Sequence, residues 1–120
     1  MSLDFDTLRK TNVRRCEESF HDLDSWTPTD WACAMAGEAG EACNEVKKLR
    51  RRFGRDGWVD VPASFLQTHF PDDLKKIGHE LADTVCYLDL LAARFGIDLG
   101  EAVREKFNIV SKRRGSEIRL

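Results

Sequence analysis

The stretch AMAGEAGEACNEVKKL, residues 34–49, carries the pattern that decides the fold class. Its apolar side chains recur three or four residues apart, which is the spacing of one face of an α-helix. This stripe consists of Met35, Ala39, Ala42, Val46 and Leu49. Three glutamates lie beside the stripe, and the first lysine or arginine that could pair with them is Lys47. The stretch therefore predicts an amphipathic helix that places carboxylates at the edge of the core.

Residues on either side set the expected ends of this helix. Thr27 can cap a helix and Pro28 suits its first turn, so the helix should begin there. It should continue to about Phe53, where Gly54 stops it. Apolar positions at helical spacing also predict an earlier helix over residues 3–23.

Two more helices are expected in the second half of the chain. The sequence Phe70-Pro71-Asp72-Asp73 opens the third helix, which should continue until Gly96. Asp98 caps the fourth, which should run from Leu99 to about Arg114. We predict no strand, because no stretch alternates apolar and polar residues for long enough.

Four helices in 120 residues predict an all-α fold, arranged as a four-helix bundle in a single domain over residues 1–120. Residues 55–69 contain Gly57 and Pro62, so we expect a loop with one helical turn there. The four cysteines lie far apart without a Cys-x-x-Cys pair, and we expect reduced, small core residues. They are Cys16, Cys33, Cys43 and Cys86.

Charge and hydropathy exclude some classes of partner. The formal net charge is -2, which gives no overall attraction to nucleic acid or to an anionic membrane. No apolar run approaches the roughly 20 residues that span a bilayer, and no leader sequence is recognised. We therefore expect a cytoplasmic protein with no membrane and no stable nucleic-acid partner.

The acidic pattern of residues 34–49 is repeated on the third helix. Its expected apolar stripe consists of Leu74, Ile77, Leu81, Val85, Leu88 and Ala92. Glu80, Asp83 and Tyr87 share one flank of that stripe, as Glu38 and Glu41 share one flank of the other. If the two helices are neighbours, the four carboxylates converge at their interface.

Four converging carboxylates repel one another and lose solvation, unless a positive charge lies between them. Magnesium or manganese, which prefer oxygen ligands, would supply that charge. Gly37 and Gly40 each disfavour the helix by about 1 kcal/mol relative to alanine. Such glycines are typical of places where a helix or a phosphate chain comes close to the backbone.

The motif Gly37-Glu38-Ala39-Gly40-Glu41, followed by Glu80-Leu81-Ala82-Asp83, resembles the MazG-like all-α nucleoside triphosphate pyrophosphohydrolases. Lys106-Phe107-Asn108 and Arg113-Arg114-Gly115 add to the resemblance, which covers about residues 26–115. It implies an enzyme in which Glu38, Glu41, Glu80 and Asp83 hold magnesium. It also implies cleavage between the α and β phosphates, giving a nucleoside monophosphate and pyrophosphate.

This chain departs from the family pattern in two ways. The fuller family motif has a further glutamate where this chain has Gly37, which bears on the number of metal ions. The interval from Glu41 to Glu80 is longer than is usual, which suggests that residues 55–69 are an insertion.

Several further residues are candidates for catalysis and substrate binding. Glu41 and Glu45 are both candidates for the base that takes a proton from water. Lys48 could bind phosphate, and the family pattern adds Lys106 and Arg113. The resemblance places Tyr87 against the nucleotide, Trp26 could stack on a base, and the Asn108 amide could hydrogen-bond to one.

Two alternative functions remain at this point. Phosphoribosyl-ATP pyrophosphohydrolase belongs to the same superfamily. The runs Arg50-Arg51-Arg52 and Lys112-Arg113-Arg114 could instead belong to a non-catalytic helical protein that binds nucleic acid or acts as an adaptor.

Apolar residues around the expected loop predict an oligomer. Trp58, Phe65 and Phe70 lie in or beside residues 57–70, where a single domain would leave them uncovered. The enzymes that this chain resembles are dimers or tetramers whose subunits share the nucleotide pocket. We therefore expect a homodimer or homotetramer, with residues 57–70 near a subunit contact.

Overall fold

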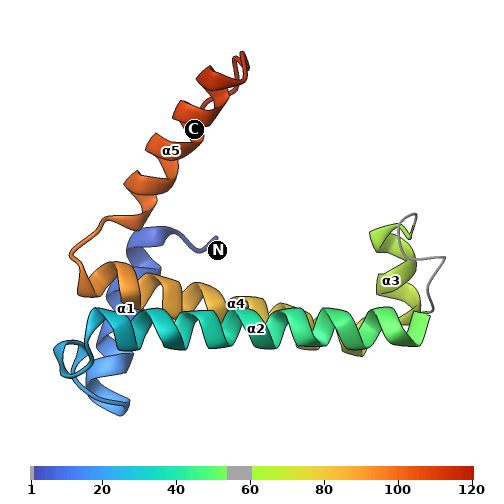
Figure 1. Cartoon of the computed structure of the whole chain (residues 1–120), viewed down its shortest axis with the longest axis horizontal. Helices are drawn as coiled ribbons and strands as arrows, with labels where there is room; N and C mark the ends of the chain where they lie inside the picture. Colours follow the sequence, from blue (N-terminus) through green and yellow to red (C-terminus); the bar gives the residue numbers. More distant parts are fainter. Residues whose placement is uncertain (1, 54–60) are drawn as a thin grey trace. The chain divides into compact units, whose positions relative to one another are not determined.

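The computed structural model describes residues 2–53 and 61–120, and the regular elements in those ranges are all helices (Figure 1). In chain order they are α1 (Phe5–Ser19), the 3-10 helix η1 (Leu23–Ser25), α2 (Pro28–Phe53), α3 (Ala63–His69), α4 (Pro71–Arg94) and α5 (Leu99–Arg113). The all-α class is confirmed, whereas the four-helix-bundle arrangement stays a prediction. Within the described ranges, no helix combines the length and the apolar character needed to cross a membrane.

The chain divides into two compact units. The first consists of Met1–Trp31 with Leu88–Leu120, and the second consists of Ala32–Tyr87. The first unit contains α1, η1 and α5, and the second contains α3 with most of α2 and α4. All the acids expected to bind metal belong to the second unit.

The predicted capping residues begin α2 and α5. Thr27 Oγ1 accepts a hydrogen bond from the Asp30 amide at 3.2 Å, and Asp30 Oδ2 accepts one from the Thr27 amide at 2.9 Å. This reciprocal pair satisfies amide groups that a helix start leaves without a partner. Asp98 caps α5 in the expected way, accepting from the Glu101 amide at 3.0 Å.

The expected end of the first helix is wrong, and the helical turn expected in the loop is longer than predicted. The first helix ends at Ser19, because the amides of Phe20 and His21 both bond to the Cys16 carbonyl, each at 2.9 Å, and close the helix there. Part of the expected loop is the seven-residue helix α3. The Phe65 ring of α3 lies edge-on to Phe53, with 5.7 Å between ring centroids, so apolar packing stabilises a segment that looked irregular. Residues 55–60 of that loop, and Gly54 before them, lie outside the described ranges.

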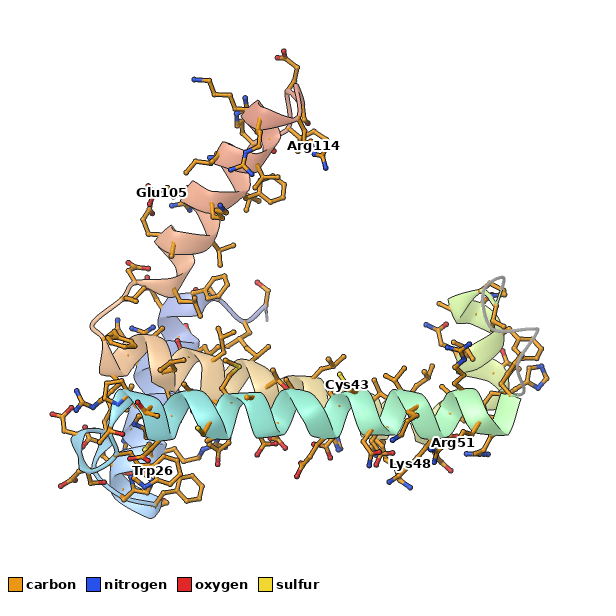
Figure 2. All side chains as sticks on the ribbon, viewed as in Figure 1. Trp26, Cys43, Lys48, Arg51, Glu105 and Arg114 are labelled. Atoms are coloured by element: carbon orange, nitrogen blue, oxygen red, sulfur yellow. The ribbon has the colours of Figure 1, made fainter. Side chains whose placement is uncertain are left out.

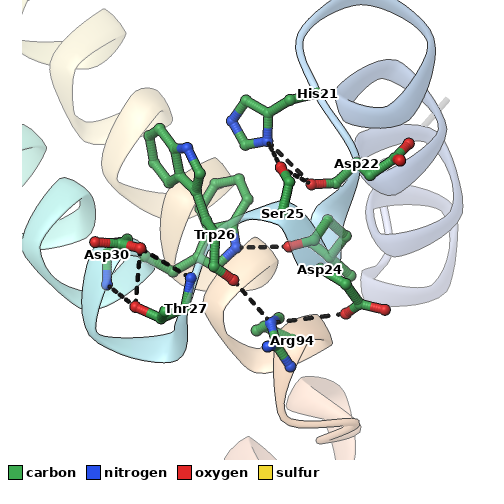
Figure 3. A network of polar contacts seen from close by, with 10 residues as sticks. His21, Asp22, Asp24, Ser25, Trp26, Thr27, Asp30 and Arg94 are labelled. Carbon is green, nitrogen blue, oxygen red and sulfur yellow. Dashed lines mark hydrogen bonds and ion pairs between the residues drawn. The ribbon is translucent and has the colours of Figure 1, made fainter.

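An aromatic cluster forms part of the core of the first unit (Figure 3). Trp31 is only 2% exposed, and its indole Nε1 donates to the Leu23 carbonyl at 3.0 Å. The Trp26 ring contacts two other rings, with its centroid 4.5 Å from that of His21 and 4.6 Å from that of Trp31. Its carbonyl accepts from Arg94 Nε at 3.0 Å.

The expected apolar stripe of α4 is wrong in its central part. Leu81 is 52% exposed and Val85 is 47% exposed, whereas Glu80 and Thr84 are half-buried. Glu80 and Thr84 each come directly before one of these exposed residues, and successive residues of an α-helix lie about 100° apart around its axis. The packed face of α4 is therefore rotated by about 100° from the expected apolar stripe. That rotation turns Glu80 towards the packed face of the second unit.

The cysteines are also less uniform than expected. All four are free thiols. Cys16 is buried and Cys86 half-buried, but Cys33 and Cys43 are exposed on α2. The core prediction is therefore wrong for those two, which lie outside the apolar stripe of their helix.

Candidate metal centre

Three of the four predicted metal ligands come together in the second unit. Glu38 and Glu41 extend from α2 and Glu80 from α4, each offering one carboxylate oxygen. These three oxygens lie within 4.8 Å of one another. The spacing Glu-x-x-Glu brings the first two onto one side of α2, and the rotation of α4 adds the third.

Asp83 is not a member of this close group, and its side chain is exposed. Its charge nevertheless acts on the group, because it contributes to raising the pKa values of both Glu38 and Glu80. The structure therefore places Asp83 near the other acids, and its role as a ligand stays a prediction.

The pKa values of two acids in this group are raised, in part because the carboxylates lie close together. Loss of solvation raises the pKa of Glu38 above its ordinary value of 4.5, and the charges of Glu41, Asp83 and Glu80 add to the effect. Loss of solvation also raises the pKa of Glu80, helped by a hydrogen bond to Glu41 that only the protonated carboxyl can make and by nearby negative charges. Both shifts show that the negative form of this group is disfavoured without a cation.

One oxygen of Glu80 supports a cation more directly. Oε2 is enclosed and has no hydrogen-bond partner among the described residues. A buried carboxylate oxygen normally has a donor or a positive charge beside it, because an unpartnered one is unfavourable. A bound cation would provide that partner.

The residues fit a hard divalent cation. All the donors are carboxylate oxygens, which magnesium and manganese prefer. The three oxygens already lie within 4.8 Å of one another, so Glu38, Glu41 and Glu80 would be the residues that hold the ion. Three carboxylates leave coordination positions for water and for substrate phosphates.

The two candidate bases differ in their surroundings. Glu45 is half-buried and accepts from Lys48 Nζ at 3.0 Å, so both side chains are already engaged in an ion pair. Glu41 is exposed and belongs to the acidic group. Lys48, predicted to bind phosphate, would have to leave Glu45 to do so. It lies on the same side of α2 as Arg51 (Figure 2).

A hollow of about 450 Å³ lies on the open face of α2 beside Glu41. Its lining consists of Gly37, Gly40, Glu41, Cys43, Asn44 and Lys47. A Cβ atom built on Gly37 or Gly40 would meet nothing within 4 Å. No neighbouring helix of the described chain therefore requires these glycines. Asn44 was not among the predicted site residues, although its position, seven residues after Gly37, puts it on the same helix face.

The remaining predicted substrate residues are placed as follows. Tyr87 is half-buried on α4 in the second unit. Trp26, Lys106, Asn108 and Arg113 belong to the first unit. Trp26 is packed between His21 and Trp31, and the Asn108 amide bonds to the main chain of Leu120. Lys106 and Arg113 are exposed and take no part in the ion pairs of residues 2–53 and 61–120.

Compared with known protein families, curated proteins and solved structures, the chain matches none of them. The MazG-like resemblance rests on the quoted motifs alone.

Proposed function

We propose that this chain is a magnesium-dependent nucleoside triphosphate pyrophosphohydrolase of the MazG-like type. It would hydrolyse ribo- or deoxyribonucleoside triphosphates between the α and β phosphates, giving a monophosphate and pyrophosphate. The observation that carries the proposal is the convergence of Glu38, Glu41 and Glu80, with the enclosed Glu80 Oε2 lacking a partner.

The roles of the acids follow from their surroundings. Magnesium, or manganese in its place, would neutralise phosphate charge and lower the pKa of a bound water. Glu38, Glu80 and one oxygen of Glu41 would hold the ion, with Asp83 as a fourth ligand. The second oxygen of Glu41 is the better placed base, because Lys48 holds Glu45 in an ion pair.

The open face of α2 supports a place for the phosphates. Lys47 and Asn44 offer donors beside Glu41, and the two glycines let a phosphate chain approach the helix backbone. Binding by Lys106 and Arg113 and the contact of Tyr87 with the nucleotide remain part of this proposal on the family resemblance. Phosphate binding by Lys48, stacking by Trp26 and a hydrogen bond from Asn108 remain part of it on the chemistry of these side chains.

We also propose a cytoplasmic homodimer or homotetramer. The exposed apolar residues Leu81 and Val85 form a patch on α4 that a second subunit would cover. For the contact near residues 57–70, Phe65 is still 39% exposed despite its packing on Phe53.

Neither alternative function gains from the structure. Phosphoribosyl-ATP hydrolysis would use the same acids, so only the choice of substrate distinguishes it. The exposed Arg50 and Arg51 lie in the last turn of α2, where the helix dipole favours cations. The basic run therefore has an explanation that requires no nucleic acid.

The test is a panel of all eight common nucleoside triphosphates with magnesium, following monophosphate and pyrophosphate together. We expect equal amounts of both products and no free phosphate unless a pyrophosphatase is added. Glu80→Gln should abolish turnover, whereas the matched control Glu18→Gln, at an exposed position of α1, should not. Release of nucleoside diphosphate, or equal activity in both variants, would refute the proposal.

A further inference from the structure

α5 packs closely at its first turn and is exposed along most of its remaining length. A Cβ atom built on Gly100 would lie 3.1 Å from Phe5 Cβ, so this turn of α5 lies directly against α1. From Val103 to Val110, in contrast, every residue is exposed except the half-buried Asn108. A helix of 15 residues is only marginally stable in water without tertiary packing. Most of α5 therefore lacks the contacts that usually stabilise a helix of its length.

The exposed part of α5 carries an apolar stripe, which consists of Val103, Phe107 and Val110. These residues are 38%, 40% and 39% exposed, and their spacing of four and then three residues places them on one face of the helix. Ile109 is exposed to a similar extent, at 46%, but it lies about 200° round the helix from Phe107. The stripe is thus a distinct surface of the kind that packs against another helix.

The start of the stripe borders an acidic hollow of about 460 Å³ in the first unit. Val103, Phe5 and Leu120 form the apolar part of its lining. Its charged lining residues are four acids and one base, namely Asp4, Asp6, Asp98, Glu101 and Arg104. Arg104 already pairs with Glu101 at 2.7 Å, and the three aspartates take no part in the ion pairs of residues 2–53 and 61–120. The hollow therefore combines apolar walls with negative charge that no cation neutralises.

The other end of the stripe is basic. Arg113 and Arg114 follow Val110 by three and four residues, so both lie beside it on the helix surface. Both are exposed, and neither belongs to an ion pair among the described residues. The acid Glu105 extends from the opposite side of α5 to Arg114 (Figure 2). The stripe thus has unpaired negative charge at one end and unpaired positive charge at the other.

We propose that α5 forms a contact between two copies of this chain, in which the two apolar stripes pack antiparallel and Arg114 of each copy lies beside the Asp6 carboxylate of the other. A two-fold axis brings the same surface of both copies together. In an antiparallel pair unlike charges meet at both ends, whereas a parallel pair would bring like charges together. This contact is additional to the one proposed at Leu81 and Val85, and it depends on no step of the proposed hydrolysis.

The apolar centre of the contact can be tested with a matched pair of variants. Phe107→Asp introduces a charge into the stripe, whereas the control Ile109→Asp introduces the same charge on the other side of α5. We expect Phe107→Asp to halve the molecular mass measured by sedimentation equilibrium at tens of micromolar. Ile109→Asp should keep the mass of the wild type, and circular dichroism should show the same helix content in both variants. Equal masses for the two variants would overturn the proposal.

Charge reversal tests the orientation of the two helices. Asp6→Lys and Arg114→Glu each place like charges together at both ends of the antiparallel pair, and each should raise the dissociation constant about fivefold or more. The double variant Asp6→Lys, Arg114→Glu restores unlike charges and should recover the dissociation constant of the wild type. Lys112→Glu is the control for Arg114→Glu, because Lys112 lies about 200° round the helix from Val110. It should associate like the wild type.

The double variant keeps the proposal falsifiable even if a single variant is poorly folded. In a parallel pair like charges would still face each other, so a double variant that associates no better than the single ones would overturn the antiparallel contact. A monomeric wild type with full helix content would also overturn it, since the stripe would then be covered by something other than a second copy. If the masses behave as expected but no triphosphate is hydrolysed, the proposed function fails and the α5 contact stands. If hydrolysis is observed but these variants leave the mass unchanged, only the α5 contact fails.

Discussion

Asp89 of α4 is fully buried, and its Oδ1 accepts a hydrogen bond from Arg9 Nε of α1 at 2.9 Å. Its Oδ2 accepts a second bond from Asn12 Nδ2 at 3.2 Å. A buried carboxylate in a stretch of leucine and alanine is thus satisfied by two side chains of α1. This polar contact fixes α1 against the end of α4 within the first unit.

Removing one partner of this contact should destabilise the fold. Asp89→Ala leaves the Arg9 charge without its buried partner, and we expect a loss of about 3 kcal/mol in the free energy of unfolding. The double variant Arg9→Met, Asp89→Leu should lose much less, because no charge is left unpaired. Urea denaturation of wild type, the single variants Arg9→Met and Asp89→Leu, and the double variant measures the coupling. Strictly additive losses would show that the pair does not act as a unit.

Metal binding should stabilise the protein through the acidic group. A cation that binds only the folded chain adds about 2.7 kcal/mol when its concentration is 100 times Kd. We expect magnesium to raise the Tm of wild type and of the Glu18→Gln control alike. In Glu80→Gln the rise should disappear. Equal magnesium-induced shifts in all three proteins would rule out this metal centre.

The acidic group should also give the metal-free protein a characteristic pH dependence. The pKa values of Glu38 and Glu80 are raised above 4.5, so the folded chain binds more protons than the unfolded chain just above that pH. Stability from these groups is therefore highest at or below pH 4.5 and falls as the pH rises through the raised pKa values. Glu80→Gln removes one of the two carboxylates, and with it part of the stability that wild type loses as the pH rises. In chelator, the stability of the variant relative to wild type should increase from pH 4 to pH 7.5, and a constant difference would contradict the assignment.

Alanine in place of Gly37 or Gly40 should raise the stability of the fold but lower the activity. Neither Cβ meets an obstacle, so Gly37→Ala and Gly40→Ala should each stabilise the fold by roughly 0.5–1 kcal/mol. If the phosphate chain approaches this face, kcat/KM should nevertheless fall about tenfold or more. Gly78→Ala on α4 is the control, since its Cβ is equally unobstructed. Gly78→Ala should gain stability and keep full activity. If all three variants behave alike, the open face of α2 is not part of the substrate site.

The exposed patch on α4 should mark a subunit contact. Replacing Leu81 and Val85 together by aspartate should lower the mass measured by light scattering, with the helix content retained. Leu3→Asp is the control, because Leu3 is 70% exposed and lies near the start of the chain. A wild type that stays monomeric at tens of micromolar while fully active would exclude the oligomer.

The sequence allowed the helices to be predicted well where local chemistry decides them. The start of α2 at Thr27-Pro28 and the cap of α5 at Asp98 depend on hydrogen bonds between residues three apart, which a reader can see in the sequence. The sequence predicted one helical turn in this loop but not the seven-residue length of α3, because the helix packs through the contact of Phe65 with Phe53, twelve residues earlier. Contacts between distant segments leave no local signal.

The candidate site was predictable to a similar extent. Glu-x-x-Glu spacing placed Glu38 and Glu41 together, and the repeat of that spacing led to Glu80. The rotation of α4 was not predictable, because an apolar stripe suggests a buried face whether this chain or another subunit covers it. Leu81 and Val85 therefore looked like core residues.

The aromatic cluster of the first unit has a spectroscopic consequence. With 4.6 Å between ring centroids, Trp26 and Trp31 are close enough for their excited states to couple. Coupled indoles give paired bands of opposite sign in circular dichroism, and His21 beside Trp26 offers a route for quenching its fluorescence. These bands therefore report on how the start of α2, which contains Trp31, packs against the residues before it. Loss of those bands would reveal local opening of the first unit while the rest of the helical signal remains.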